Sequence, residues 1–207
     1  MTQYNREEIT AVENAEQKAV KKKLAPSAIA GIVIVCALVV AFSIFLPFYL
    51  KSNEPNRELY KNEQIKITAN GEEIGVYKID DLLALEGVEE VEFNAIYDTS
   101  SSEPVEKTYT GIELKKVLSA LGVDLSVART IVFKASDGAN KAYAAEDIVN
   151  PNNVFIAYKV NGRAFNEGIK AAAFNDEAED GGPFVVIKVS DTYSQNRCKL
   201  LTEVSVS

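Results

Sequence analysis

The stretch Tyr109–Ile148, YTGIELKKVLSALGVDLSVARTIVFKASDGANKAYAAEDI, carries the strongest fold signals in this chain. Thr110 and Glu113 have the spacing of a capping box, in which each side chain accepts a backbone N–H of the other residue, so a helix is predicted to begin here. Gly122 lies where a helix commonly ends in a left-handed residue. Apolar residues between these signals fall on one helical face: Leu114, Val117, Leu118 and Leu121. The stretch therefore predicts a short, capped helix.

A strand and a tight turn follow the predicted helix. Thr130–Ala135 (TIVFKA) is a run of β-branched and aromatic residues of strand length. Asp137-Gly138 then supplies two residue types that tight turns favour, because Asp accepts local backbone N–H groups and Gly adopts positive φ. A second helix is predicted to begin before Ile148. Helix, strand, turn and helix in this order indicate a domain that mixes helices and strands.

The rest of the chain from residue 61 alternates short strand signals with turns. Asn70-Gly71 and Asn161-Gly162 are typical of type I′ hairpin turns. A short helix is predicted to be capped by Asp80, and a polar loop is predicted over Asp98–Val105. The other predicted strands are 64–69, 73–77, 88–97, 152–160, 163–165, 184–189 and 199–206, the last two joined by a polar link over 190–197. Several strands with few, short helices predict an α+β fold with mixed or antiparallel sheets.

An uncharged run precedes this domain. No residue is charged over Leu24–Leu50, and at 1.5 Å per residue this run is long enough to cross a hydrocarbon core of ~30 Å. A cleaved signal peptide is the alternative, but its apolar region would be shorter, about 7–15 residues, and Pro47–Lys51 is a poor cleavage site. Lysines crowd the N-terminal flank: Lys18, Lys21, Lys22 and Lys23. The positive-inside rule therefore predicts a single-pass protein of the cell membrane, with its N-terminus in the cytoplasm and residues 51–207 outside.

The sequence thus divides into four predicted parts: a cytoplasmic tail at 1–24, a transmembrane signal anchor at 25–50 in contact with membrane lipid, a polar stalk at 51–60 and an extracytoplasmic domain at 61–207. The chain has 22 basic and 30 acidic residues and a net charge of −8, which disfavours nucleic acid as a partner. Cys198 is the only cysteine beyond the membrane run, so the outer domain forms no internal disulfide. This composition favours a Gram-positive bacterium as the source.

The motif order of the domain resembles the oxidoreductase molybdopterin-binding domain, the fold of the sulfite oxidase family. The resemblance rests on YTGIELKKVLSALGV and the strand that leads into ASDGANKAYAAEDI, followed by AYKVNGRAF, GGPFVVIKV and KLLTEVSV, and it covers roughly residues 60–207. It implies a sulfite oxidase-like α+β fold, a molybdopterin cofactor and oxidoreductase chemistry.

The chain departs from that family where the family's chemistry lies. In the family, a single Cys thiolate on a loop after an early strand binds molybdenum, a soft metal that needs such a ligand. The matching segment here, Val91–Ser102 (VEFNAIYDTSSS), contains no Cys. The family's pocket also uses His and Arg for phosphate, whereas this chain has no His, and Ala139 replaces the usual aromatic residue after Asp-Gly. We therefore expect the fold without the molybdenum centre. If Cys198 is a strand residue, we expect its role to be packing.

Two places are predicted to bind a cofactor or another ligand. One is the Asp137-Gly138 turn with Lys141, near where the resemblance puts the cofactor cleft. The other is Gly181-Gly182 with Arg163, because successive glycines present backbone N–H groups to an anion. Both places also suit plain structural loops. The acidic run 176–180 offers oxygen ligands for Ca²⁺ but lacks the spacing of an EF-hand loop, and a solvated loop is its alternative.

These observations leave three functional hypotheses. The first is a membrane-anchored extracytoplasmic domain that lacks molybdenum and binds a ligand or partner protein as an accessory of a redox system. The second is an active molybdopterin-dependent oxidoreductase that holds its cofactor through Asp137, Lys141, Arg163 and backbone groups. The third is a structural or interaction module of the cell envelope. A membrane redox protein or an envelope protein is the expected partner, and the lack of His excludes Ser-His-Asp and Cys-His catalysis.

Overall fold

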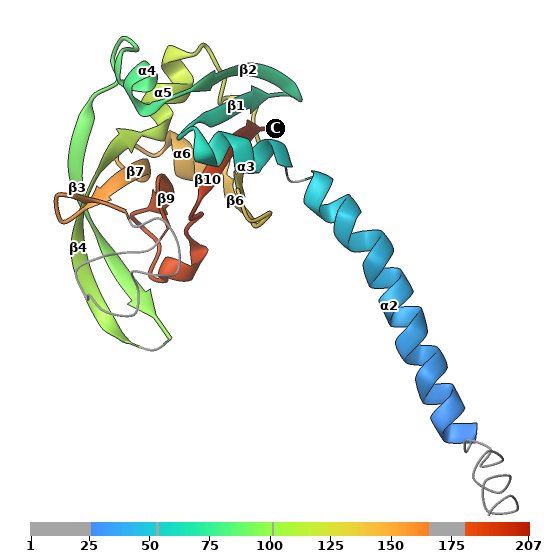
Figure 1. The fold of residues 1–207 in the computed structure, drawn as a ribbon. Helices are drawn as coiled ribbons and strands as arrows, with labels where there is room; N and C mark the ends of the chain where they lie inside the picture. The colour runs from blue at the N-terminus through green and yellow to red at the C-terminus, as the bar shows by residue number, and fades with distance from the viewer. Residues whose placement is uncertain (1–25, 53, 101, 166–180) are drawn as a thin grey trace, which may run out of the picture. The chain divides into compact units, whose positions relative to one another are not determined.

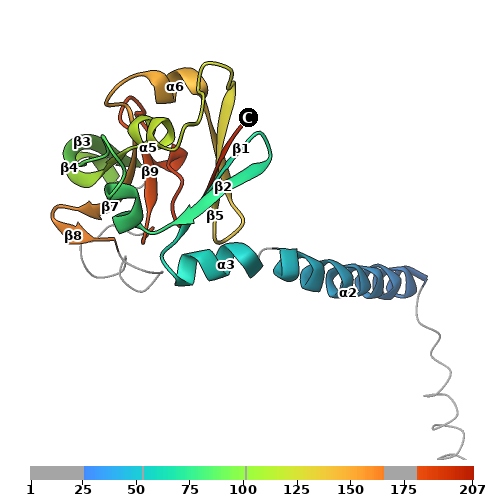
Figure 2. The ribbon, with the colours of Figure 1, turned by 90° about the horizontal axis from the view of Figure 1, so that it is seen from above.

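The computed structural model describes residues 26–52, 54–100, 102–165 and 181–207. The chain divides into two compact units, Met1–Lys51 and Ser52–Ser207, each described by itself. Figures 1 and 2 show the second unit from two directions. The predicted cytoplasmic tail at 1–24 and the acidic run at 176–180 lie outside the described residues.

Helix α2 (Pro26–Ser52) covers the described part of the first unit. Its segment 27–47 has 21 residues and a mean hydropathy of 3.0, so it is long and apolar enough to cross a membrane. It is the one helix of this kind within the described ranges. The segment contains no charged residue and its large apolar side chains are exposed, as suits a helix surrounded by lipid tails. Membrane insertion and orientation stay predictions.

The first sheet of the second unit has the strand order β2-β1-β10-β5-β6. Its strands are β1 (Ile65–Ala69), β2 (Glu72–Tyr77), β5 (Thr130–Ala135), β6 (Asn140–Ala144) and β10 (Leu201–Val206). β1 and β10 run parallel, with Ile67 opposite Val204, and the other neighbours are antiparallel. Helix α3 (Glu54–Lys61), formed by residues of the predicted stalk, packs against β1 and β10. The last strand of the chain is therefore the centre of this sheet.

The second sheet has the order β3-β4-β7-β8, with β9 also paired to β7, and every pair is antiparallel. Its strands are β3 (Glu90–Thr99), β4 (Ser102–Glu113), β7 (Val154–Val160), β8 (Arg163–Ala164) and β9 (Val185–Lys188). Figure 1 shows β3 and β4 as a long hairpin. The short helices are α4 (Ile79–Leu83), α5 (Leu114–Ala120), α6 (Ala145–Val149) and the 3₁₀ helix η1 (Ser194–Asn196). The predicted α+β class with mixed sheets is confirmed.

Two hydrophobic clusters pack against the second sheet. The main core joins both sheets and helix α5, and its members include Ile67, Ile112, Leu118, Phe133, Ile156, Val186 and Val204. The second cluster consists of Ala95, Tyr109, Ala157, Val160, Phe165, Val185 and Ile187, with Phe93 against it. Because neighbouring residues of β7 and β9 alternate between the two clusters, these two strands are buried on both faces. This explains why β7 and β9 are continuous apolar runs.

The strand and the turn predicted within Tyr109–Ile148 are confirmed. Strand β5 has the predicted bounds Thr130–Ala135, and its buried side chains alternate with half-buried ones. In the turn, Asp137 Oδ1 accepts the Ala139 N–H at 2.9 Å, and Gly138 has a φ of 89°. Helix α5 ends just before Gly122, which has a φ of 73°. These local signals therefore predicted the backbone correctly.

The predicted capping box is wrong. Helix α5 begins at Leu114 with Glu113 as its N-cap, and Thr110 lies inside β4. β4 pairs with β7 as far as Glu113, which lies opposite Phe155, and this pairing keeps the backbone of Thr110 extended. The Glu113 carboxylate instead accepts the Asn152 N–H at 2.8 Å. Pairing between distant strands thus overrides the local helix signal.

Two further local predictions are wrong. The polar loop predicted over Asp98–Val105 is the end of the β3–β4 hairpin, because cross-strand hydrogen bonds satisfy the backbone whatever the polarity of the side chains. Helix α4 has Lys78 as its N-cap in place of Asp80, and Asp81 Oδ2 accepts the Lys78 N–H at 2.8 Å. The carboxylate that stabilises this helix start therefore lies inside the first turn, where the helix dipole also favours it.

Candidate functional site

The polar link Ser190–Arg197 joins β9 to β10, and we call it the β9–β10 link. Its second half is tied to strand β6 by two side chains. Lys141 Nζ donates to the carbonyl of Gln195 at 2.7 Å, and Tyr143 Oη donates to the carbonyl of Asn196 at 3.0 Å. Because these bonds satisfy backbone carbonyls, the link keeps a defined course without belonging to either sheet.

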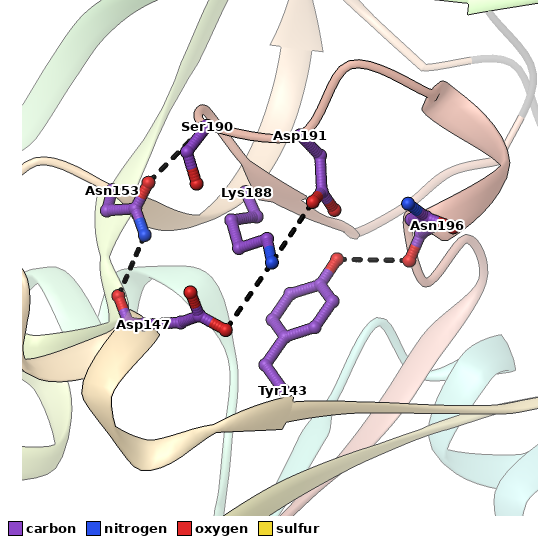
Figure 3. Close-up of polar contacts among 7 residues, drawn as sticks. All are labelled: Tyr143, Asp147, Asn153, Lys188, Ser190, Asp191 and Asn196. Carbon is purple, nitrogen blue, oxygen red and sulfur yellow. Dashed lines mark hydrogen bonds and ion pairs between the residues drawn. The ribbon is translucent and has the colours of Figure 1, made fainter.

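The first half of the link is tied by a group that we call the Lys188 cluster: Asp147, Asn153, Lys188 and Asp191 (Figure 3). Lys188 Nζ, at the end of β9, lies 3.0 Å from Asp191 Oδ1 in the link and 3.4 Å from Asp147 Oδ2 in α6. Asn153 Nδ2 donates to the carbonyl of Asp147 at 3.0 Å, and Asn153 Oδ1 accepts the Ser190 N–H at 3.2 Å. The cluster therefore joins the link to α6 and to the start of β7.

Protonation in the Lys188 cluster follows from burial and charge. Burial lowers the pKa of Lys188, but Asp191 and Asp147 outweigh it and raise that pKa above its ordinary value, so the ammonium stays charged. Burial, reinforced by the charge of Asp191, raises the pKa of Tyr143, so its hydroxyl stays a hydrogen-bond donor. Lys188 Nζ lies 5.1 Å from the centre of the Tyr143 ring. Asp191 Oδ2 is buried and has no hydrogen-bond partner within the described part of the chain.

Arg197, at the end of the link, is only 5% exposed. Its Nη1 donates to Tyr109 Oη in β4 at 2.7 Å, and its Nη2 donates to the carbonyl of Ile96 in β3 at 2.7 Å. Ser194 Oγ also donates to a β3 carbonyl, that of Asp98. These hydrogen bonds fasten the link to the β3–β4 hairpin. They also hold the buried guanidinium of Arg197 in a fixed orientation.

Three cationic side chains, one of them Arg197, approach the ring of Tyr97. The Tyr97 ring centre lies 4.0 Å from Lys107 Nζ, 5.6 Å from Arg197 Cζ and 5.9 Å from Lys199 Nζ. Arg197 Cζ also lies 4.8 Å from the centre of the Tyr109 ring. Within about 6 Å of a ring centre, a cation is attracted by the negative face of the ring. We call these five residues the Tyr97 cluster; together they concentrate positive charge that can attract an anionic group.

The two predicted binding places meet at Leu200. The Leu200 N–H donates to the carbonyl of Gly181 at 2.8 Å, and the Leu200 carbonyl accepts the N–H of Ser136, which precedes the Asp137-Gly138 turn, at 2.9 Å. Leu200 itself has a φ of 54°, an unusual value for a bulky side chain, which shows how tightly this junction is determined. Lys141, on the strand after the turn, binds the β9–β10 link as described above.

The glycine pair is packed against side chains of the chain itself. A methyl group at Gly182 would lie 2.8 Å from Phe165 Cβ, and one at Gly181 would lie 2.8 Å from Lys199 Cγ. Arg163 is exposed on β8, opposite Val160 in the strand register. Gly181 therefore borders the Tyr97 cluster through Lys199, whereas anion binding by the backbone of this pair stays a prediction.

The cysteines do not fit a molybdenum centre. Cys198 is 2% exposed within the main core, and burial raises the pKa of its thiol to about 12, with Asp137 adding to this effect and Lys141 opposing it. A protonated, enclosed thiol is a poor ligand for a metal that needs thiolate. Cys36, the other cysteine, lies on helix α2. Within the described ranges, no three or more His, Cys, Asp or Glu side chains gather where a metal ion fits.

Sequence reasoning missed the Tyr97 cluster. One available signal was the position of Tyr97 inside Val91–Ser102, the segment that matches the metal-binding segment of the resembled family. A second was Arg197, the single basic residue of a polar link that otherwise joins two apolar strands. Neither signal showed that these residues meet, because about a hundred positions separate them in the sequence.

No protein-family description matches the chain, and no curated protein matches it. Among solved structures, the chain is similar to the sulfane dehydrogenase SoxCD from Paracoccus pantotrophus, with a TM-score of 0.52 and 14% sequence identity. The match covers 71% of this chain and 38% of that chain, so this chain corresponds to much less than the whole of that protein. At this identity the likeness concerns the fold, and it supports the predicted α+β architecture of the sulfite oxidase type.

Proposed function

We propose that this chain is a membrane-anchored, extracytoplasmic domain that lacks molybdenum and binds an anionic group, carried by a ligand or by a partner protein, at the Tyr97 cluster. In this role the chain is an accessory of a redox system. The observation that carries the proposal is the convergence of three cations on Tyr97, in the segment where the resembled family has its metal-binding Cys.

The charge distribution supports an anionic ligand. The chain as a whole carries a net charge of −8, whereas three cationic side chains gather around the Tyr97 ring. Arg197 is buried and held by Tyr109 and Ile96, whereas Lys107 and Lys199 are half-buried, so that a ligand can reach them from solvent. A fixed guanidinium with two adjustable ammonium groups suits carboxylate, sulfate or phosphate groups.

The anchoring part of the proposal rests on α2 and on charge asymmetry. An apolar segment of 21 residues satisfies the length needed to cross a bilayer. The lysines at 18 and 21–23 precede it, and the positive-inside rule then favours a cytoplasmic N-terminus, with the Tyr97 cluster on the outer side of the membrane.

Metal analysis tests the first part of the proposal. We expect the full chain, purified in detergent from cells supplied with molybdate, to contain far less than one molybdenum atom per chain, because its one thiol outside α2 is enclosed in the core. Inductively coupled plasma mass spectrometry gives the ratio. Stoichiometric molybdenum would instead favour the active oxidoreductase.

Binding measurements test the second part. The double variant Lys107→Gln/Lys199→Gln is expected to bind sulfate or phosphate about tenfold more weakly than the wild type, because two ion pairs of about 0.5–1 kcal/mol each are lost. Isothermal titration of the full chain in detergent measures the dissociation constant.

A matched control removes the same charge elsewhere. Lys61→Gln/Lys78→Gln changes two exposed lysines outside the Tyr97 cluster and is expected to leave the dissociation constant within about twofold. Equal weakening by both double variants would show that only the net charge matters and would reject the Tyr97 cluster as the site.

A further inference from the structure

We propose that Lys188 is a positioning residue for the Tyr97 cluster, and that it acts at a distance by holding both halves of the β9–β10 link. This inference rests on the proposed function, since it concerns the same anion site. Lys188 makes none of the contacts that define the Tyr97 cluster; among the described residues, its ammonium contacts Asp147, Asp191 and the ring of Tyr143.

The connection runs through the link at two points. At the start of the link, Lys188 Nζ pairs with Asp191, and the neighbouring Ser190 N–H is held by Asn153. Towards its end, the link is held by Tyr143, the aromatic ring near the same ammonium group, through the carbonyl of Asn196. Figure 3 shows Lys188 between these two attachments. Asn196 directly precedes Arg197 in the chain, so the Tyr143 ring that Lys188 contacts holds the backbone carbonyl next to Arg197.

Removing the ammonium would leave a specific defect. Asp147 and Asp191 would then face the same space without their shared cation, and Asp191 Oδ2 already has no hydrogen-bond partner within the described residues. Two like charges in a mostly buried place repel each other. The link belongs to neither sheet, and three side-chain hydrogen bonds, from Asn153, Lys141 and Tyr143, fasten its backbone to the rest of the domain, so it is the part that can move in response. A displaced link moves Arg197 away from Tyr97 and Tyr109.

The test compares Lys188→Met with two controls in the full chain in detergent. Lys116→Met removes an exposed ion pair, that of Lys116 in α5 with Glu89 at 2.5 Å, in which no residue of the link takes part. Val117→Ala creates a defect in the main core without touching the link. Sulfate titration gives the dissociation constant, and hydrogen exchange with mass spectrometry gives the protection of each segment. Lys188→Arg, which keeps the charge, is the conservative variant.

Lys188→Met is expected to weaken sulfate binding about tenfold and to lose exchange protection over residues 190–198, while β3 and β5 keep theirs. Both controls, and Lys188→Arg, are expected to bind within about twofold of the wild type. If Lys188→Met binds as tightly as Val117→Ala, or loses protection evenly along the chain, Lys188 is only a stabilising residue and the inference is overturned.

The same experiment separates the two proposals. A wild-type chain that binds neither sulfate nor phosphate would reject the anion site, and exchange over residues 190–198 would still decide whether Lys188 controls the link. A wild-type chain that binds, together with a Lys188→Met variant that also binds normally, would keep the anion site and reject the positioning role.

Discussion

Gly111→Ala is expected to lower the free energy of unfolding of the domain by about 3 kcal/mol, at the upper end of the effects of overpacking. Gly111 lies in β4, and a methyl group there would contact the carbonyl oxygen of Ile156 and lie 2.8 Å from Ala157 Cα. Both neighbours are backbone atoms of β7, so they cannot turn aside as a flexible side chain can. Relief requires β4 and β7 to separate, in the middle of the second sheet.

Urea denaturation of the full chain in detergent, followed by circular dichroism, measures this loss. Gly75→Ala is the matched control, because Gly75 also lies in a strand, the edge strand β2, and the three atoms nearest to a methyl group there all belong to the side chain of Tyr77. The Tyr77 ring can rotate away, so a loss below about 1 kcal/mol is expected. If the two variants lose similar free energies of unfolding, the backbone of β7 does not approach Gly111 of β4 closely enough to exclude a methyl group.

Glu203→Gln is expected to lower the free energy of unfolding by about 2 kcal/mol at neutral pH. The Glu203 side chain is 5% exposed at the centre of the first sheet, with Lys66 Nζ at 2.8 Å and Lys134 Nζ at 2.7 Å. Glutamine keeps the size but loses the negative charge that both lysines pair with, and its NH2 group cannot accept a hydrogen bond from the second ammonium. Both lysines are partly exposed, at 26% and 39%, and can turn towards water, which limits the loss to less than that of a fully buried pair.

The effect of Glu203 depends on pH in a defined direction. Burial raises the pKa of Glu203, but Lys134 and Lys66 together outweigh burial and hold that pKa below its ordinary value of 4.5. A carboxylate with a lowered pKa in the folded state contributes its stability above the unfolded pKa and loses it as the pH falls through the folded pKa. The difference in stability between wild type and Glu203→Gln is therefore expected to shrink below about pH 4.5. Denaturation at pH 7, 5 and 3 measures it, and a constant difference would contradict the assignment.

Local backbone chemistry explains what could be predicted from the sequence. Both Asn-Gly turns have positive φ at their two residues, as a type I′ turn requires. The φ values are 52° for Asn70, 82° for Gly71, 49° for Asn161 and 74° for Gly162. Strand β5 keeps its predicted bounds because β-branched and aromatic residues favour a pleated, half-buried surface. In such cases the residues that determine the conformation are neighbours in the sequence.

Long-range pairing explains what could not be predicted. Thr110 has a good helix-start signal, yet it lies in β4 because β7, some fifty residues later, pairs with it. The candidate site has the same origin. The sequence predicts Lys141 as a site residue, and its ammonium contacts the β9–β10 link. Arg197 and Tyr97, in contrast, meet only because β3, β4 and the link come together in space. No periodicity or motif spacing encodes such a meeting.

The stretch Tyr109–Ile148 and the motifs around it determined the α+β class, strand β5 and the Asp137 turn. The lack of Cys in Val91–Ser102 and of His in the chain determined the expectation that molybdenum is not bound. The uncharged run before that stretch determined a helix able to span a membrane. Only the tertiary structure decided where α5 begins, that β10 is the centre of the first sheet, and that three cations share Tyr97. The physical reason is the distance along the sequence over which the interactions act. Turn and strand preferences depend on adjacent residues, whereas strand pairing and charge clustering depend on which distant segments the core brings together.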